Sequence, residues 1–92
     1  MKLELSFGVV IKRRRLALGV SQEQLAIRTS QYKSNVCDHE RGFHVPSLVA
    51  LIAYADALDC TLLELIAEAQ RNADPSSALS YTPAYEAELK KA

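Results

Sequence analysis

Glycine and proline are scarce in this chain, with three of each among 92 residues. Strict alternation of apolar and polar residues is hardly seen, so strands have little support and the chain is predicted to be all-α. No apolar run is long enough to cross a bilayer. The first residues place their charges after a short apolar stretch and offer no small-residue cleavage site, which argues against a signal peptide. We therefore expect a cytoplasmic protein with no membrane segment.

Cysteine is limited to Cys37 and Cys60, which lack CxxC spacing and would stay reduced in the cytoplasm. Cys37 with His39 and His44 matches no zinc-site spacing. A nucleophile with its base and acid, a Gly-rich phosphate loop and clustered carboxylates are also missing. We therefore expect no metal, no cofactor and no enzyme activity.

The chain as a whole has no net charge, but each half carries a surplus of charge of one sign. Residues 1–45 hold eight Lys and Arg against four acidic residues, a surplus of four positive charges. Residues 46–92 hold three against seven, a surplus of four negative charges. Such asymmetry indicates that the N-terminal half meets a polyanion, although a chance dipole on a solvated surface would look the same.

Helical periodicity and capping residues predict five helices, over residues 7–18, 21–30, 33–40, 46–58 and 61–72. The predicted N-caps are Ser6, Ser21 and Thr61, and Gly19 and Gly42 are predicted to end the first and third helices. The fourth and fifth helices are the most apolar and should anchor the core. Their predicted buried residues are Leu48, Leu51, Ile52, Ala55, Leu58, Leu62, Leu63, Leu65, Ile66 and Ala69.

The sequence changes character after residue 72, so the chain divides into a domain over residues 1–72 and a tail over residues 73–92. Asp74-Pro75-Ser76-Ser77 is typical of a linker. Residues 83–91 could add a short sixth helix. A helix of that length is marginal in water on its own, so this one would either fray or dock on another surface.

The segment from Ser21 to Gly42 reads SQEQLAIRTSQYKSNVCDHERG. It resembles the S-Q-E-x-L-A … E-R-G motif of the XRE/Cro family, the phage-repressor-like helix-turn-helix regulators. The flanking segments FGVVIKRRRLALGVSQ and PSLVALIAYADALDCTLLELI resemble the other helices of that family, so the resemblance covers about residues 7–66. It implies a five-helix lambda-repressor-like domain that binds double-stranded DNA, with residues 33–40 as the recognition helix in the major groove.

The recognition helix is predicted to read bases through one polar face. Lys33 can donate to guanine O6 and N7, and Ser34 can donate or accept. Asp38 can only accept, so cytosine N4 and adenine N6 are its targets. Tyr32 and Asn35 flank this face and could reach a phosphate or a base edge. A polar face that only touches water is the simpler alternative.

The resemblance assigns further roles outside that face. It implies a phosphate contact for Gln22, in the first turn of the second helix, where backbone amides favour an anion. Arg41 is a further expected phosphate contact. Arg15 and Glu40 match a family pair that fixes the first helix to the end of the recognition helix, so this pair is predicted to be structural.

Several residues depart from the family pattern. Ser30 stands where glycine is usual, and Gln31 where an aliphatic residue is usual. Tyr32 is predicted to fill the space that Gln31 leaves, and His39 occupies a normally apolar position. Asp38 directs a negative charge at a negative partner, which would weaken non-specific binding.

Taken together, these features predict a small transcription regulator, most simply a repressor, that binds a roughly palindromic operator as a homodimer. Its dimer contacts are expected in the C-terminal half. The alternative is a protein-interaction module, such as an antitoxin or adaptor, whose tail grips a partner through Tyr81, Tyr85 and Leu89. Removing residues 74–92 would separate the two, because a repressor should keep its DNA contacts.

Overall fold

A computed structural model describes residues 2–73 of the chain. Five helices make up this part: α1 (Leu3–Ala17), α2 (Gln22–Arg28), α3 (Lys33–Arg41), α4 (Leu48–Ala57) and α5 (Leu62–Ala73). The described residues form no strand, and the predicted all-α class is confirmed. The predicted linker, sixth helix and tail contacts fall on residues 74–92, outside the described residues. No helix of the described part is both long and apolar enough to span a membrane.

Several helix ends follow the local capping chemistry that the sequence predicted. Ser21 accepts a hydrogen bond from the Gln24 amide while the Gln24 side chain accepts from the Ser21 amide, which completes a capping box. Thr61 accepts from the Glu64 amide at 3.1 Å in the same manner. Gly42 follows α3 with φ +79°, a left-handed conformation that glycine adopts without strain.

Two predicted helix starts are wrong. Ser6 is no N-cap: α1 begins at Leu3, and the buried Ser6 hydroxyl donates to the carbonyl oxygen of Ala69 in α5. Because α5 supplies this acceptor, Ser6 is satisfied inside the helix and α1 continues past it. The fourth helix begins at Leu48 rather than at Pro46, since Ser47 caps it by accepting from the Ala50 amide at 3.2 Å.

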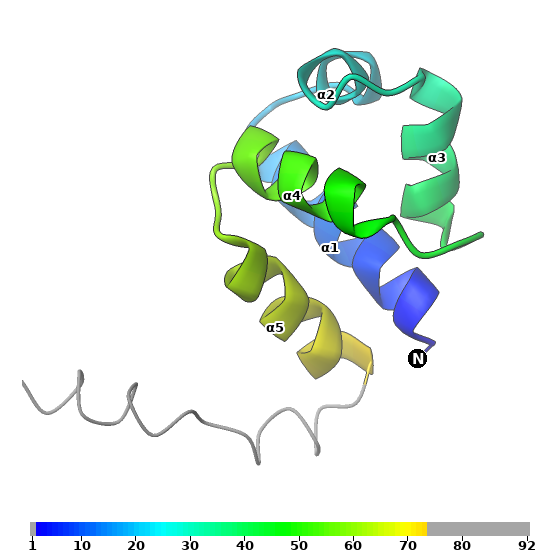
Figure 1. Ribbon diagram of the computed structural model, residues 1–92, viewed down its shortest axis with the longest axis vertical. Helices are drawn as coiled ribbons and strands as arrows, with labels where there is room; N and C mark the ends of the chain where they lie inside the picture. The colour runs from blue at the N-terminus through cyan, green and yellow to red at the C-terminus, as the bar shows by residue number, and fades with distance from the viewer. Residues whose placement is uncertain (1, 74–92) are drawn as a thin grey trace, which may run out of the picture.

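Helix α1 lies at the centre of the domain and packs against α3 and α5. Helix α4 packs against α2 and α5 and lies in front of α1 in the view of Figure 1. Val10 and Ile11 of α1, Leu25 of α2, Val36 of α3 and Leu65 of α5 are fully buried in one core. Gly8 lets α1 approach the end of α3, because a Cβ there would overlap the backbone carbonyl oxygens of His39 and Glu40. The lack of a side chain at Gly8 therefore allows α1 to pack directly on the C-terminal end of α3.

The predicted buried stripe of α4 and α5 is only partly right. Leu51, Ala55, Leu58, Leu65 and Ala69 are buried, but Leu48, Ile52 and Leu63 are more than half exposed. Tyr54, which was not predicted, is fully buried instead. The apolar sequence of these helices covers more of the helix surface than the core contacts, since α4 packs on α2 and α5 along one side.

Candidate nucleic-acid interface

Helices α2 and α3 are joined by a tight turn built from backbone bonds and one strained residue. The Ser30 amide donates to Ile27 and the Gln31 amide donates to Ala26, which closes the end of α2. Ser30 adopts φ +55°, the left-handed region that explains why glycine is usual at this position. The hydroxyl of Thr29 donates to the Leu25 carbonyl at 2.8 Å and stabilises the same helix end.

The prediction that Tyr32 fills the space beside Gln31 is wrong. The Tyr32 side chain is 81% exposed. Gln31 itself is half-buried, and its amide donates to the Thr29 hydroxyl at 2.9 Å. Because Gln31 finds polar partners inside the turn, no aromatic ring is needed there, and Tyr32 projects from the start of α3 into solvent.

Helix α3 has two chemically distinct faces. Val36, His39 and Glu40 are buried against the rest of the domain. The rest of the helix surface is polar: Lys33, Ser34 and Asn35 are exposed and Asp38 is half-buried. The structure therefore brings together, on one open surface, the side chains that the sequence nominated for reading bases.

The end of α3 is held by a buried ion pair between Arg15 of α1 and Glu40. Arg15 Nε donates to Glu40 Oε2 at 2.6 Å, and Nη2 donates to Oε1 at 3.1 Å. The third guanidinium nitrogen, Nη1, donates to the Val20 carbonyl at 3.0 Å. Arg15 and Glu40 are each only 8% exposed, so the pair joins α1 to α3 within the protein interior.

Gln22 occupies the first position of α2, and its half-buried side chain bonds to α3. Its Nε2 donates to Glu40 Oε1 at 3.0 Å, and its Oε1 accepts from the Cys37 thiol at 3.0 Å. The resemblance gave this residue to phosphate binding, and the sequence showed no sign of these two contacts. The side chain links the two helices of the unit directly.

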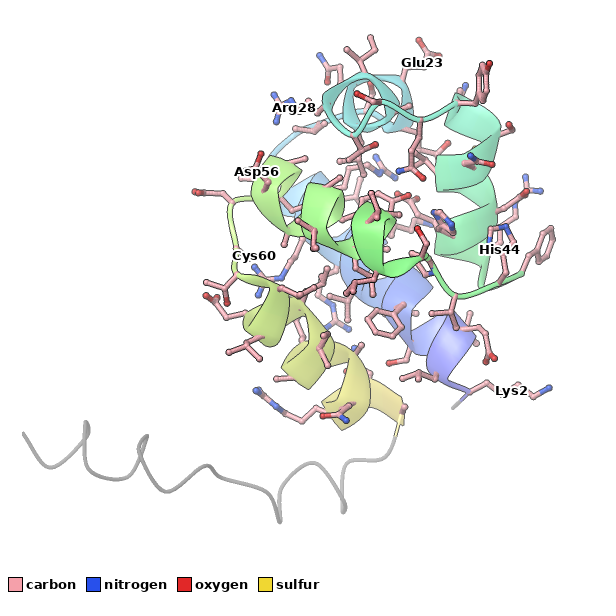
Figure 2. All side chains as sticks on the ribbon, in the orientation of Figure 1. Lys2, Glu23, Arg28, His44, Asp56 and Cys60 are labelled. Atoms are coloured by element: carbon pink, nitrogen blue, oxygen red, sulfur yellow. The ribbon has the colours of Figure 1, made fainter. Side chains whose placement is uncertain are left out.

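The remaining predicted contact residues also interact within the protein. Lys33 Nζ lies 3.2 Å from Glu23 Oε1 in an exposed pair, so its ammonium group is only loosely held. Arg41, at the exposed end of α3, places its guanidinium 5.8 Å from the ring centre of Phe43. Figure 2 shows Glu23 projecting outward from α2 and His44 in the loop that follows α3.

A family model described as a helix-turn-helix domain matches residues 6–69. The chain belongs to this helix-turn-helix family. The match confirms the resemblance to XRE-type regulators and supports the predicted function, DNA-binding transcription regulation.

Solved structures show the same helix-turn-helix fold. The restriction-modification controller protein C.AhdI from Aeromonas hydrophila is 39% identical, with a TM-score of 0.64 over 66% of this chain and 92% of that one. The clp gene regulator ClgR from Corynebacterium glutamicum is 21% identical, with a TM-score of 0.76 over 87% and 85%. A second ClgR structure is 22% identical, with a TM-score of 0.73 over 78% and 94%. No curated protein sequence matches the chain.

The basic run of this helix-turn-helix domain, Lys12 to Arg15, is mostly committed to the fold. Arg14 Nε and Nη2 donate to Glu68 Oε2 of α5 at 3.0 and 2.7 Å, and Arg13 lies 3.6 Å from Oε1 of the same carboxylate. Burial alone would lower the pKa of Arg14, but the hydrogen bond that Arg14 donates to Glu68 and the negative charges around it together outweigh burial and raise that pKa. The positive charge of the N-terminal half is thus partly neutralised by the acidic C-terminal half.

A buried polar contact joins α3 to α4. His39 Nδ1 lies 2.7 Å from the Tyr54 hydroxyl, and the His39 ring meets the His44 ring edge-on at 4.7 Å between centres. Burial, followed by the charge of His44, lowers the pKa of His39. Burial raises the pKa of Tyr54 to about 12, so its hydroxyl keeps its proton and can donate to His39. Tyr54 thereby provides a hydrogen-bond partner for His39, which stands at a position that is normally apolar in the family.

Proposed function

We propose that this chain is a homodimeric repressor that binds a roughly palindromic operator with one α3 helix in each major groove. The observation that carries the proposal is the two-sided construction of α3: its inner face is fixed by Val36 and the Arg15–Glu40 pair, while its outer face is polar and open. The major groove admits an α-helix and distinguishes all base pairs. Such a protein acts in the cytoplasm, where its operator lies.

Base recognition is assigned to Lys33, Ser34 and Asp38, with Asn35 beside them. Lys33 would release Glu23 and donate to a guanine, because an exposed ion pair of this kind contributes at most about 1 kcal/mol. Asp38 would accept from cytosine or adenine and disfavour other bases at its position. Both residues would therefore affect sequence preference more than total affinity.

Phosphate contacts are assigned to residues at the two ends of α3 and at the start of α2. The exposed Tyr32 hydroxyl and the Arg41 guanidinium flank the base-reading face. Gln22 contributes through the first turn of α2, where backbone amides point at an anion. These groups position the domain on the duplex without reading its sequence.

The dimer is assigned to the C-terminal half. Four exposed apolar side chains lie on α4 and α5, namely Leu48, Val49, Ile52 and Leu63. Two subunits would place their recognition helices about 34 Å apart along the duplex. Most of the C.AhdI chain is covered by the similarity, and that protein is a controller, which supports regulation by a chain of this size.

Selection of binding sites from random DNA, repeated at several salt concentrations, tests the proposal. The parent protein should return a palindromic site. Lys33→Ala and Asp38→Ala should each change the preferred base at one position per half-site, by about 1–3 kcal/mol of discrimination. Arg71→Ala, which removes an exposed cation from α5, is the matched control and should leave the preference unchanged. A parent protein that enriches no sequence contradicts the proposal.

A further inference from the structure

The Gln22 side chain is the feature of the interface that phosphate binding leaves unexplained. It reaches from the first turn of α2 to two residues of α3, Cys37 and Glu40, at 3.0 Å each. Those two residues lie three positions apart, so they are neighbours on one face of α3. A single amide group therefore holds two successive points along the recognition helix.

We propose that Gln22 is a positioning residue for base recognition, which fixes the rotation of α3 about its own axis and so determines which α3 side chains reach the base edges. This inference rests on the proposed placement of α3 in the major groove.

The chemistry of the two partners allows the amide only one orientation. The Glu40 carboxylate can only accept, so it must face the Nε2 group, and the Cys37 thiol donates to Oε1. A flipped amide would place its oxygen against the carboxylate and lose both bonds. The amide nitrogen can bond only to Glu40, and the amide oxygen can accept only from Cys37. Both bonds form together at only one rotation of α3, so the contact favours that rotation.

Few other directional contacts lie in the N-terminal part of α3. Among residues 2–73, the side-chain bonds from α3 to other helices involve Lys33, Cys37, His39 and Glu40. The Lys33 pair is exposed and weak. The bonds of His39 and Glu40 lie toward the C-terminal end, and the Val36 side chain holds the helix by buried packing alone, without a hydrogen bond. Of the bonds between α3 and the interior of the domain, the Gln22–Cys37 bond is therefore the nearest to the base-reading residues.

A small rotation is enough to matter. Side-chain tips lie about 6 Å from the axis of an α-helix. A turn of about 15° would move them by about 1.5 Å, which breaks a hydrogen bond that must stay within a few tenths of an ångström of its optimum. Loss of the Gln22 bridge should therefore change which bases are preferred.

Phosphate binding alone makes a different prediction for the same residue. A lost phosphate contact weakens binding about equally on all sequences. A lost positioning contact changes the relative affinity for different sequences. The two roles can coexist, because the Gln22 amide carries a second N–H that the Glu40 bond does not use.

The experiment compares base preferences from random-DNA selection for the full-length parent protein and four variants. Gln22→Met keeps the length of the side chain and removes both bonds. Cys37→Ala removes one bond with little change in volume, and Cys37→Ser keeps a donor for Gln22. Gln70→Met, at an exposed site on α5, is the matched control.

We expect Gln22→Met to change the discrimination at the bases read by Lys33 or Ser34 by at least about fivefold. Cys37→Ala should change it in the same direction, and Cys37→Ser and Gln70→Met should keep the parental pattern. Equal weakening on all sites with an unchanged pattern in Gln22→Met and Cys37→Ala would overturn the positioning role and leave the proposed function standing. A parent protein without any preference would overturn both. Should Gln22→Met fail to fold, Cys37→Ala decides.

Discussion

At the scale of single residues, the domain depends on charges that are buried and paired. Arg15 and Glu40 bond to one another, and Arg15 also donates to the Val20 carbonyl while Glu40 also accepts from Gln22. A buried charge without its partner is far less stable than the pair, because the protein interior cannot replace water around it. The pair therefore stabilises α3 in one position chiefly by making every other position costly.

Arg15→Ala should lower the free energy of unfolding by about 3–5 kcal/mol, since it leaves the Glu40 carboxylate buried and unpaired. Arg13→Ala, on the same helix, is the matched control: Arg13 is exposed and lies 3.6 Å from Glu68, so its loss should cost at most about 1 kcal/mol. Urea unfolding followed by circular dichroism measures both. Equal midpoints for Arg15→Ala and the parent would show that the pair does not hold α3 in place.

At the scale of elements, the stability of the packing between α3 and α4 should depend on pH through the protonation of His39. Burial and the charge of His44 lower the pKa of His39, and the hydroxyl of Tyr54 faces its ring from α4. The unfolded chain takes up a proton at the ordinary histidine pKa of about 6.5, and the folded protein does so only at lower pH. Stability contributed by neutral His39 is therefore complete above about pH 7 and is lost as pH falls through the lowered pKa.

The stability of the parent should fall as the pH drops below about 6.5, with a slope of at most about 1.4 kcal/mol per pH unit from this residue. His39→Gln keeps a polar partner for Tyr54 and cannot titrate in this range, so its stability should vary less with pH. Unfolding curves at several pH values measure the difference between the two proteins, in which titratable groups far from His39 cancel. Parallel pH profiles would contradict the role of His39.

Elements and their ends could be predicted where the chemistry is local. The capping box of Ser21 and Gln24, the cap at Thr61 and the left-handed Gly42 each depend on residues within one turn of helix. Ser6 was misread because its acceptor lies 63 residues away, on α5. Sequence spacing alone could not show that α5 would supply a carbonyl oxygen there.

The candidate site divides in the same way. The polar face of α3 could be read from the sequence because it needs only helical periodicity, and the Arg15–Glu40 pair came from the family motif. The bridge from Gln22 to Cys37 and Glu40, and the pairing of Arg14 with Glu68, join residues 15 to 54 positions apart. Such contacts depend on how the helices cross, which neither periodicity nor net charge specifies.

At the scale of the whole molecule, the surface of residues 2–73 includes the polar face of α3 and, on α4 and α5, several exposed apolar side chains. Ile52 on α4 and Leu63 on α5 are 52% and 69% exposed. Burying a leucine or isoleucine side chain fully is worth about 1.5–3 kcal/mol. A single small domain also buries too little DNA surface for strong specificity, so pairing of two domains would supply what one lacks.

Leu63→Glu and Ile52→Glu should therefore shift the protein from dimer toward monomer, because each would place a charge in the proposed apolar interface. The dissociation constant of the dimer, measured by analytical ultracentrifugation, should rise at least about tenfold, since even about 1.4 kcal/mol of lost interface energy has that effect. Affinity for a palindromic site should fall with it, while affinity for one half-site should stay near the parental value. Leu16→Glu, at an exposed apolar position on α1, is the matched control and should remain dimeric. If all three variants dimerise like the parent, the contacts between subunits lie elsewhere, and the apolar side of α4 and α5 must be explained by another partner.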